Sequence, residues 1–241
     1  MNLTHDNINI LLEKIKNKDI INLKVEPINK EFLFTLGILF AAGKKINILN
    51  KEELDLTTQK KSFYIMSYVW YLLSNDDFPK KDLSNVKTNL EIIVENFKRV
   101  GLTIKTIENN PIENKIFLIC PVRNASIEQK QEMEDYVNNK KNEGYIIHAP
   151  HLDTVQKDIL GGYSICLQNA NAVATSSRID IYYDQKSTGS VFDLGVAYYL
   201  NKPLHIINEN KIVFKEDDFI DNLIKNWPYK QDIKIKKLDK E

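Results

Sequence analysis

The clearest candidate for chemistry is a polar turn that joins a short strand to a helix in the last third of the sequence. It contains the hydroxyl groups of Ser187, Thr188 and Ser190, with Gly189 between them. Serine and threonine side chains cap helix N-termini, and glycine lets another group approach the backbone closely. Because the free N–H groups at a helix start attract anions, the turn predicts a site for an anionic group.

A single carboxylate, Asp193, follows this turn, within what we expect to be the first turn of the helix. Two interpretations of it are open. The helix dipole favours negative charge near a helix N-terminus, so Asp193 could be an ordinary capping charge. It would also lie near the carboxyl edge of the sheet, where ligands of open α/β folds bind, so it could act on a bound ligand.

A resemblance favours the second interpretation. The spacing Ser187-x-Gly189-x-x-x-Asp193-Leu194-Gly195, followed by Ala197 and by Lys202-Pro203 before the next strand, resembles the nucleoside 2-deoxyribosyltransferase family. In that family a glutamate is the nucleophile on the anomeric carbon. The resemblance implies this role for Asp193, whose side chain is one methylene shorter. The wider group includes hydrolases of nucleoside 5′-monophosphates, which tend to have serine where Ser187 stands.

The resemblance covers about residues 113–228 and implies roles for other positions. Ser187, Thr188, Gly189 and Ser190 would bind a 5′-phosphate or 5′-hydroxyl group. Asn169 stands where the family commonly has an aspartate that contacts the sugar or the leaving group. The aromatic residue that often ends the first strand of the family is missing here, and Phe117 is the nearest aromatic residue to that position.

Three more polar residues fall in loops that we expect at the same edge of the sheet. Arg123 follows an apolar run, and its planar guanidinium could hold a phosphate or a base edge. His151 and Asp153 lie in the loop after the next strand and are candidates for recognising or protonating the base. Each has a plainer alternative, a solvated arginine near a helix start or ordinary polar loop residues.

These residues need a sheet and helices to position them. Residues 116–120, 144–148, 179–183 and 204–207 read as strands. Helices are expected at 126–142, 158–176 and 218–227, and between the last two strands. This alternation predicts an α/β fold, flavodoxin-like or Rossmann-like, with a parallel sheet and flanking helices. We place a domain boundary near Asn109-Asn110-Pro111, which gives a first unit at residues 1–110 and a second at residues 111–241.

The first unit reads as a degenerate, partial copy of the second. Residues 34–50 align without a gap to residues 192–208, at a constant offset of 158. Thr35 takes the place of Asp193, and Asn29-Lys30-Glu31 takes the place of the serine and glycine turn, so this copy lacks the chemistry. Chance similarity between two strand-helix-strand units is the alternative. Because the family completes its pocket across a subunit interface, the first copy could act as a built-in partner, and the chain as a monomer or homodimer.

The composition of the chain limits the kinds of molecule that we expect it to bind. The 241 residues carry 33 basic and 33 acidic side chains, and this balance argues against nucleic acid or an anionic membrane as a bulk partner. No apolar run approaches the length of a membrane span, so we expect a cytoplasmic protein. The two cysteines, Cys120 and Cys166, have no metal-ligand spacing and are expected to be reduced and buried. We expect neither a metal nor a cofactor.

Two classes of function remain open. The first is an enzyme that hydrolyses or transfers the N-glycosidic bond of a nucleoside or nucleotide through a carboxylate nucleophile; Ser187 favours hydrolysis. The second is a non-catalytic nucleotide-binding or sensor protein, which the shorter Asp193 and the uncharged Asn169 favour. Cleavage of NAD is a third alternative.

Overall fold

A computed structural model describes most of the chain. The described residues are 5–25, 29–50, 104–122, 125–154 and 162–229, together with the single positions 63, 66, 67, 70, 71 and 74.

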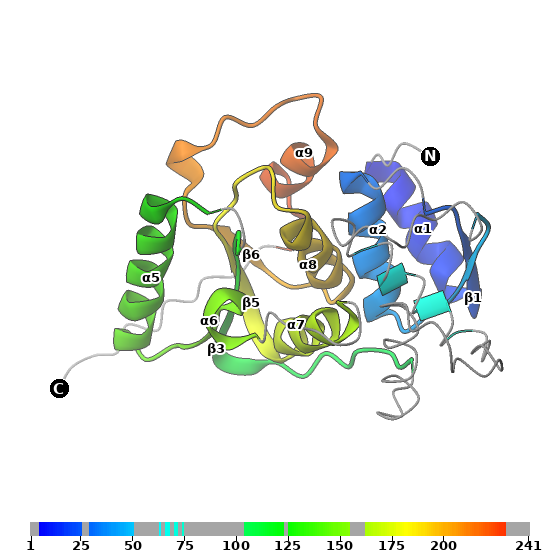
Figure 1. Ribbon diagram of the computed structural model, residues 1–241, viewed down its shortest axis with the longest axis horizontal. Helices are drawn as coiled ribbons and strands as arrows, with labels where there is room; N and C mark the ends of the chain where they lie inside the picture. The colour runs from blue at the N-terminus through cyan, green and yellow to red at the C-terminus, as the bar shows by residue number, and fades with distance from the viewer. Residues whose placement is uncertain are drawn as a thin grey trace, which may run out of the picture.

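A parallel sheet of four strands forms the centre of the second half. Its order is β4-β3-β5-β6, with all neighbours parallel. The strands are β3 (Ile112–Ile119), β4 (Ile146–His148), β5 (Ser176–Ile181) and β6 (Leu204–Ile206). Parallel pairing requires crossover connections, and helices supply them (Figure 1). The predicted α/β class with a parallel sheet between helices is confirmed.

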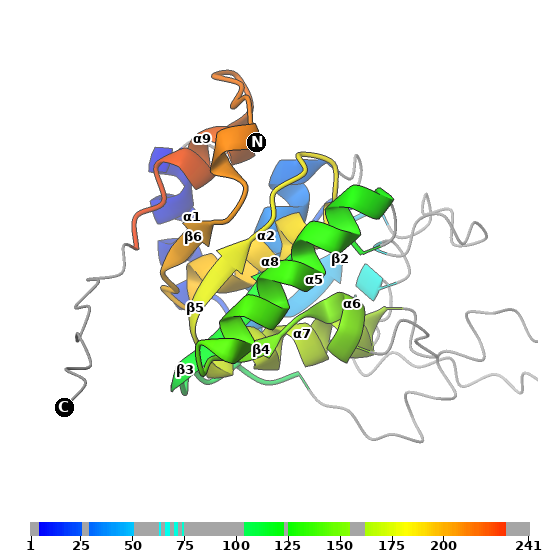
Figure 2. The same cartoon turned by 90° about the vertical axis from the view of Figure 1, so that its left-hand side faces the viewer.

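Helices cover both faces of this sheet because the side chains of β3 alternate between them. Ile116 and Leu118 pack under α5 (Ile127–Asn142), against Met133 and Val137. Phe117 and Ile119 point to the opposite face, which α7 (Tyr163–Thr175) and α8 (Thr188–Tyr199) cover. Figure 2 shows α5 crossing in front of the sheet, with α8 behind it. The chain closes with the 3-10 turn η2 (Glu209–Lys211) and helix α9 (Phe219–Lys225).

The N-terminal elements form a second, smaller α/β layer. Strands β1 (Ile20–Leu23) and β2 (Lys45–Ile48) pair in parallel, and helices α1 (His5–Lys16) and α2 (Lys30–Ala41) accompany them. The layers therefore run from α5 through the large sheet to α7 and α8, then to α1 and α2, and end at β1 and β2 (Figure 1). None of the helices in the described part of the chain has the length and apolar character that a membrane-spanning helix needs.

The N-terminal elements correspond to later ones at one offset. Helix α2 has the same bounds as α8 after a shift of 158 residues, since 188 − 30 = 158 and 199 − 41 = 158. Helix α1 ends 159 residues before α7, since 175 − 16 = 159, so these two helices correspond to within one residue. The offset found from residues 34–50 therefore also relates the preceding helices, which have little sequence identity.

Individual hydrogen bonds repeat at the same offset. The backbone N–H of Val25 donates to Asn50 Oδ1 at 3.0 Å, and the backbone N–H of Tyr183 donates to Asn208 Oδ1 at 2.9 Å. Val25 follows β1 and Tyr183 follows β5, while Asn50 follows β2 and Asn208 follows β6. Each asparagine thus ties the end of one strand to the end of its neighbour in the same way.

Helices α2 and α8 pack closely against each other through two glycines. A Cβ atom on Gly37 would lie 2.1 Å from the carbonyl oxygen of Phe192, and a Cβ atom on Gly195 would lie 2.1 Å from the carbonyl oxygen of Phe34. The two contacts are equivalent, because Gly195 and Phe192 each stand 158 residues after their counterparts. The two units therefore face each other as subunits of a two-fold symmetric dimer would.

Candidate functional site

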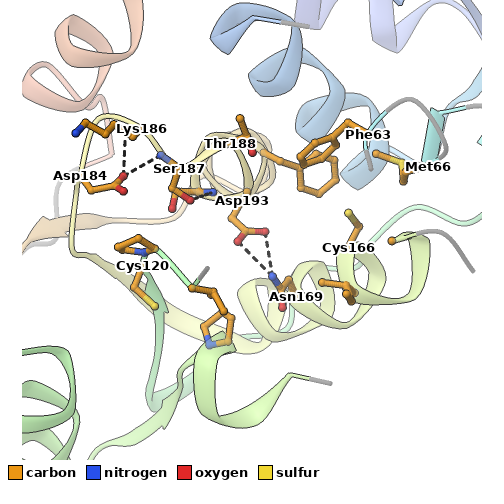
Figure 3. A pocket seen from close by; sticks show the side chains of 18 of the residues that line it. Phe63, Met66, Cys120, Cys166, Asn169, Asp184, Lys186, Ser187, Thr188 and Asp193 are labelled. Atoms are coloured by element: carbon orange, nitrogen blue, oxygen red, sulfur yellow. Dashed lines mark hydrogen bonds between the residues drawn. The ribbon is translucent and has the colours of Figure 1, made fainter. Parts of the chain in front are cut away.

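A cavity of about 410 Å³ opens at the carboxyl edge of the large sheet. Its walls come from the end of β3, the turn before α8, helix α7 and two residues of the N-terminal half, Phe63 and Met66 (Figure 3). This volume lies in the range of small-molecule sites, and carboxyl edges of parallel sheets are where such sites form.

The turn after β5 is held by its own hydrogen bonds. Asp184 Oδ1 accepts from the backbone N–H of Lys186 at 3.1 Å and of Ser187 at 2.9 Å. Ser187 then caps α8 by accepting from the backbone N–H of Ser190 at 3.4 Å. Sequence analysis named Ser187 as one of three candidate caps, with Thr188 and Ser190, and did not identify Asp184 as the residue that shapes the turn.

Asp221 supports this turn from behind. Gln185 adopts a left-handed backbone conformation, with φ at 61°, which is uncommon for a residue other than glycine. Its side-chain amide donates to Asp221 Oδ2 at 2.6 Å, and Asp221 Oδ1 accepts from the Tyr183 hydroxyl at 2.6 Å. Asp221 is fully buried, so this contact fixes the turn on the core of the domain.

The start of α8 presents groups that the described residues leave unsatisfied. Ser190 Oγ lines the cavity and is buried, yet it has no hydrogen-bond partner among the described residues. Thr188 and Gly189 line the cavity beside it and are exposed. A Cβ atom on Gly189 would meet no protein atom within 4 Å, so packing within the protein does not require glycine there. A buried hydroxyl without a partner and free helix N–H groups together suit an anionic ligand.

Asp193 lies in the wall of the same cavity, with only 6% of its surface exposed. The prediction that it falls in the first turn of the helix is wrong, because α8 begins at Thr188 and Asp193 is its sixth residue. Ser187 caps the helix, so Asp193 is not a capping charge. In the described part of the chain no basic side chain forms an ion pair with it.

Burial is the largest influence on the pKa of Asp193. It raises the pKa of the carboxyl group to about 7, and a hydrogen bond from Asn169 lowers the pKa only in part. Asn169 Nδ2 lies 3.4 Å from Asp193 Oδ1 and 3.3 Å from Oδ2, as the dashed lines in Figure 3 show. The structure thus brings together Asn169 and Asp193, which the sequence resemblance placed in one site. Near neutral pH, both protonation states of Asp193 are populated.

His151 and Asp153 are not among the residues that line the cavity. They belong to the short helix α6 (Pro150–Asp153), where Asp153 Oδ2 accepts from the backbone N–H of Ala149 at 2.7 Å. His151 Nδ1 lies 3.4 Å from Cys120 Sγ, and burial lowers the pKa of this histidine. Asp153 therefore closes its own helical turn, and His151 contacts a cavity residue without lining the cavity itself.

The remaining predicted positions divide into three cases. Arg123 lies outside the described residues. Phe117 is fully buried in the core rather than in the cavity. Cys120 and Cys166 are buried and form no disulfide, as expected, but both line the cavity, and burial raises the pKa of Cys120 to about 12.

Sequence analysis missed Phe63 and Met66 as site residues. In the sequence, the apolar residues at 57–73 are typical of a buried helix that closes the first unit. The side chains of Phe63 and Met66 were therefore interpreted as part of the hydrophobic core. Phe63 does pack on Phe192, with ring centroids 5.7 Å apart, but it also faces the cavity (Figure 3). Phe219, on α9, packs in a similar way on Phe34, the counterpart of Phe192, with ring centroids 5.8 Å apart. Phe219 stands 219 − 63 = 156 residues after Phe63 rather than 158, so the repeat offset gave no signal for Phe63.

Comparison with known proteins gives no relative: no protein-family model, no curated protein and no solved structure matches the chain. Within the described ranges, no three histidine, cysteine, aspartate or glutamate side chains gather as a metal site would require.

Proposed function

We propose that the cavity binds a nucleoside 5′-monophosphate or a nucleoside, and that Asp193 cleaves its N-glycosidic bond. The observation that carries this proposal is the burial of Asp193 in a cavity wall beside the N-terminus of α8, with no ion-pair partner among the residues that the structure describes. A buried carboxylate costs stability, and such groups concentrate at functional sites.

The start of α8 would hold the phosphate. The backbone N–H groups of Thr188 and Gly189 and the hydroxyl of Ser190 offer donors in one place, and Lys186 adds a positive charge at the cavity edge. The open space beside Gly189 leaves room for phosphate oxygens to approach the backbone. Thr188 and Gly189 lie about one helical turn before Asp193, so a 5′-phosphate bound there would bring the sugar toward the Asp193 carboxylate.

The reaction would proceed in two displacements. The ionised Asp193 attacks C1′, a bond forms between its carboxylate oxygen and C1′, and the bond from C1′ to the base nitrogen breaks with its electron pair leaving on the base. Water then attacks C1′, gives up a proton to solvent or to the departed base, and releases the carboxylate. Burial assists the first step, because a desolvated carboxylate is a stronger nucleophile than a hydrated one.

The N-terminal half would complete the site. Phe63 and Met66 form the apolar wall opposite Asn169, where a flat base could stack (Figure 3). The close contact between Gly37 and Gly195 holds the two units together, as a dimer interface would. The first unit cannot itself act, because Leu11 and Thr35 stand at the offset positions of Asn169 and Asp193.

A nucleotide-binding protein without turnover is the second candidate. Two observations favour it: the pKa of Asp193 near 7 leaves part of the carboxylate protonated at neutral pH, and Asn169 supplies no negative charge. Such a protein would keep the anion site at α8 and would retain its ligand unchanged.

One experiment separates these functions. The full chain is incubated with nucleosides, deoxynucleoside and ribonucleoside monophosphates, and NAD, and free base is measured by chromatography. We expect base release from a monophosphate, its loss in Asp193→Ala, and normal release in Asp217→Ala, a matched change at an exposed position. Tight binding without any base release would support the sensor, and release from NAD alone would indicate NAD cleavage. Neither binding nor release would refute both functions.

A further inference from the structure

A row of four polar side chains runs from the sheet to Asp193. His148 Nε2 on β4 lies 3.1 Å from Thr154 Oγ1, and the Thr154 hydroxyl donates to Asn169 Oδ1 at 3.0 Å. Asn169 Nδ2 in turn donates to both carboxylate oxygens of Asp193, at 3.3 and 3.4 Å. Thr154 and Asn169 are both buried, so these groups depend on one another for hydrogen bonds.

When Asp193 is ionised, the chemistry of each group fixes which partner donates in each hydrogen bond of this row. An ionised carboxylate can only accept hydrogen bonds, so Asn169 must turn its NH₂ group toward Asp193. That orientation leaves Asn169 Oδ1 facing Thr154, whose hydroxyl must then donate. The 3.1 Å contact between Thr154 Oγ1 and His148 Nε2 then requires a proton on Nε2. The imidazole ring is held in place by stacking on Phe117, with ring centroids 5.4 Å apart and an angle of 10° between the planes.

We propose that His148 and Thr154 are positioning residues that orient the Asn169 amide and thereby stabilise the ionised form of Asp193. This inference relies on the proposed function only for the role of Asp193 as a nucleophile. The orientation itself follows from the hydrogen bonds. Neither His148 nor Thr154 lines the cavity, so both act through Asn169.

The opposite direction of the row matches the protonated form of Asp193. A carboxylic acid would donate to Asn169 Oδ1, Asn169 Nδ2 would donate to Thr154, and Thr154 would donate to an unprotonated His148 Nε2. Doubly protonated His148 cannot accept this last hydrogen bond. Burial lowers the pKa of His148, so near neutral pH the ring is uncharged and both tautomers are accessible. The two directions differ in strength, because only the first ends on a charged carboxylate, where a hydrogen bond is about twice as strong as one between neutral groups. Loss of the Thr154 hydroxyl, or of the His148 ring that positions it, should therefore cost the ionised form more and favour protonated Asp193.

Other titratable groups act on both ends of the row. Cys120, Asp184 and Lys186 line the cavity with Asp193. Asp153 raises the pKa of His148, and Lys115 lowers it. All of them remain in place when Thr154 is changed, so a comparison of Thr154 variants isolates the contribution of the hydroxyl group.

The test measures the ionisation of Asp193 directly, without a substrate. Aspartate carboxyl carbons of the full chain are labelled with ¹³C and titrated by NMR, and the Asp193 signal is assigned by its loss in Asp193→Asn. In Thr154→Val, which keeps the shape of the side chain, we expect the pKa of Asp193 to rise by up to about one unit, because the Asn169 amide that donates to the carboxylate loses the hydroxyl group that orients it. Thr154→Ser keeps the hydroxyl group and should leave the pKa at its wild-type value.

A second pair of variants tests the other end. His148→Gln can still present an N–H group to Thr154, whereas His148→Leu cannot, so only His148→Leu should raise the pKa of Asp193. An unchanged pKa in Thr154→Val, or equal shifts in Thr154→Val and Thr154→Ser, would overturn the proposal. If these shifts occur in a protein that releases no base from any nucleotide, the positioning role stands and the proposed glycosidase activity falls.

Discussion

Replacing Asp193 by asparagine should stabilise the folded protein at alkaline pH. The substitution keeps the size of the side chain and removes a charge that is buried in the cavity wall, with 6% of the residue exposed. Burial raises the pKa of Asp193 to about 7 from its ordinary value of 3.8. The folded state therefore holds the proton more tightly than the unfolded state, and ionisation of Asp193 destabilises the fold.

The sign and the pH window follow from these two pKa values. Below about pH 4 the carboxyl group is protonated in both states and contributes no penalty. The loss of stability grows as pH rises toward 7 and stays constant above that. It reaches at most about 4 kcal/mol, because the pKa of Asp193 is about 7 in the folded state and 3.8 in the unfolded state. Between pH 5 and pH 8.5 this loss grows by about 3 kcal/mol, because the folded-state pKa of about 7 lies two pH units above pH 5.

Urea unfolding of the full chain, followed by tryptophan fluorescence at pH 5, 7 and 8.5, measures this difference. The advantage of Asp193→Asn over wild type should grow by about 3 kcal/mol across that range, whatever constant cost the new amide brings. Asp217→Asn makes the same chemical change at an exposed position and should show no such growth. A stability difference between Asp193→Asn and wild type that is independent of pH would refute the buried-carboxylate argument.

Three further substitutions test the site and the contact between the two units. Gly189→Ala should leave the free energy of unfolding unchanged or higher, because the new Cβ meets no protein atom, yet weaken calorimetric binding of a nucleoside monophosphate about tenfold or more. Gly37→Ala should lower urea stability by about 1–3 kcal/mol, because its Cβ would lie 2.1 Å from Phe192 O; equal stability would contradict the close packing. Phe63→Ala should raise KM about tenfold with little change in kcat if a base stacks there, and an unchanged KM would exclude that contact.

Local patterns predicted the elements that carry the anion site. The run of β-branched and aromatic residues at 179–183, the Ser187 cap and the following apolar helix are short-range signals, and each reappears in β5 and α8. Sequence analysis assigned Asp193 to the first turn of α8, whereas it lies in the second. The start of the helix was undefined, because Ser187, Thr188 and Ser190 were all candidate caps. The hydrogen bond from Ser187 decides among them.

Contacts between distant residues could not be predicted in this way. His151 and Asp153 were assigned to the site because their loop follows a strand, but the helical turn of α6 directs the Asp153 carboxylate to its own backbone. His148 and Thr154 drew no attention, since only folding places Thr154 beside Asn169, 15 residues further along the chain. Sequence analysis also did not recognise α1 as the counterpart of α7. The two helices hold the same position in the repeat, but few of their residues are identical.

The most direct test of the central claim is the mass of the intact protein after rapid mixing with a nucleoside monophosphate at pH 8, where Asp193 is largely ionised. The proposed displacement predicts a transient gain equal to a sugar phosphate residue, located on the peptide that contains Asp193 and absent from Asp193→Ala. Base release by the wild-type chain with no such adduct, together with release by Asp193→Ala at the same rate, would contradict it.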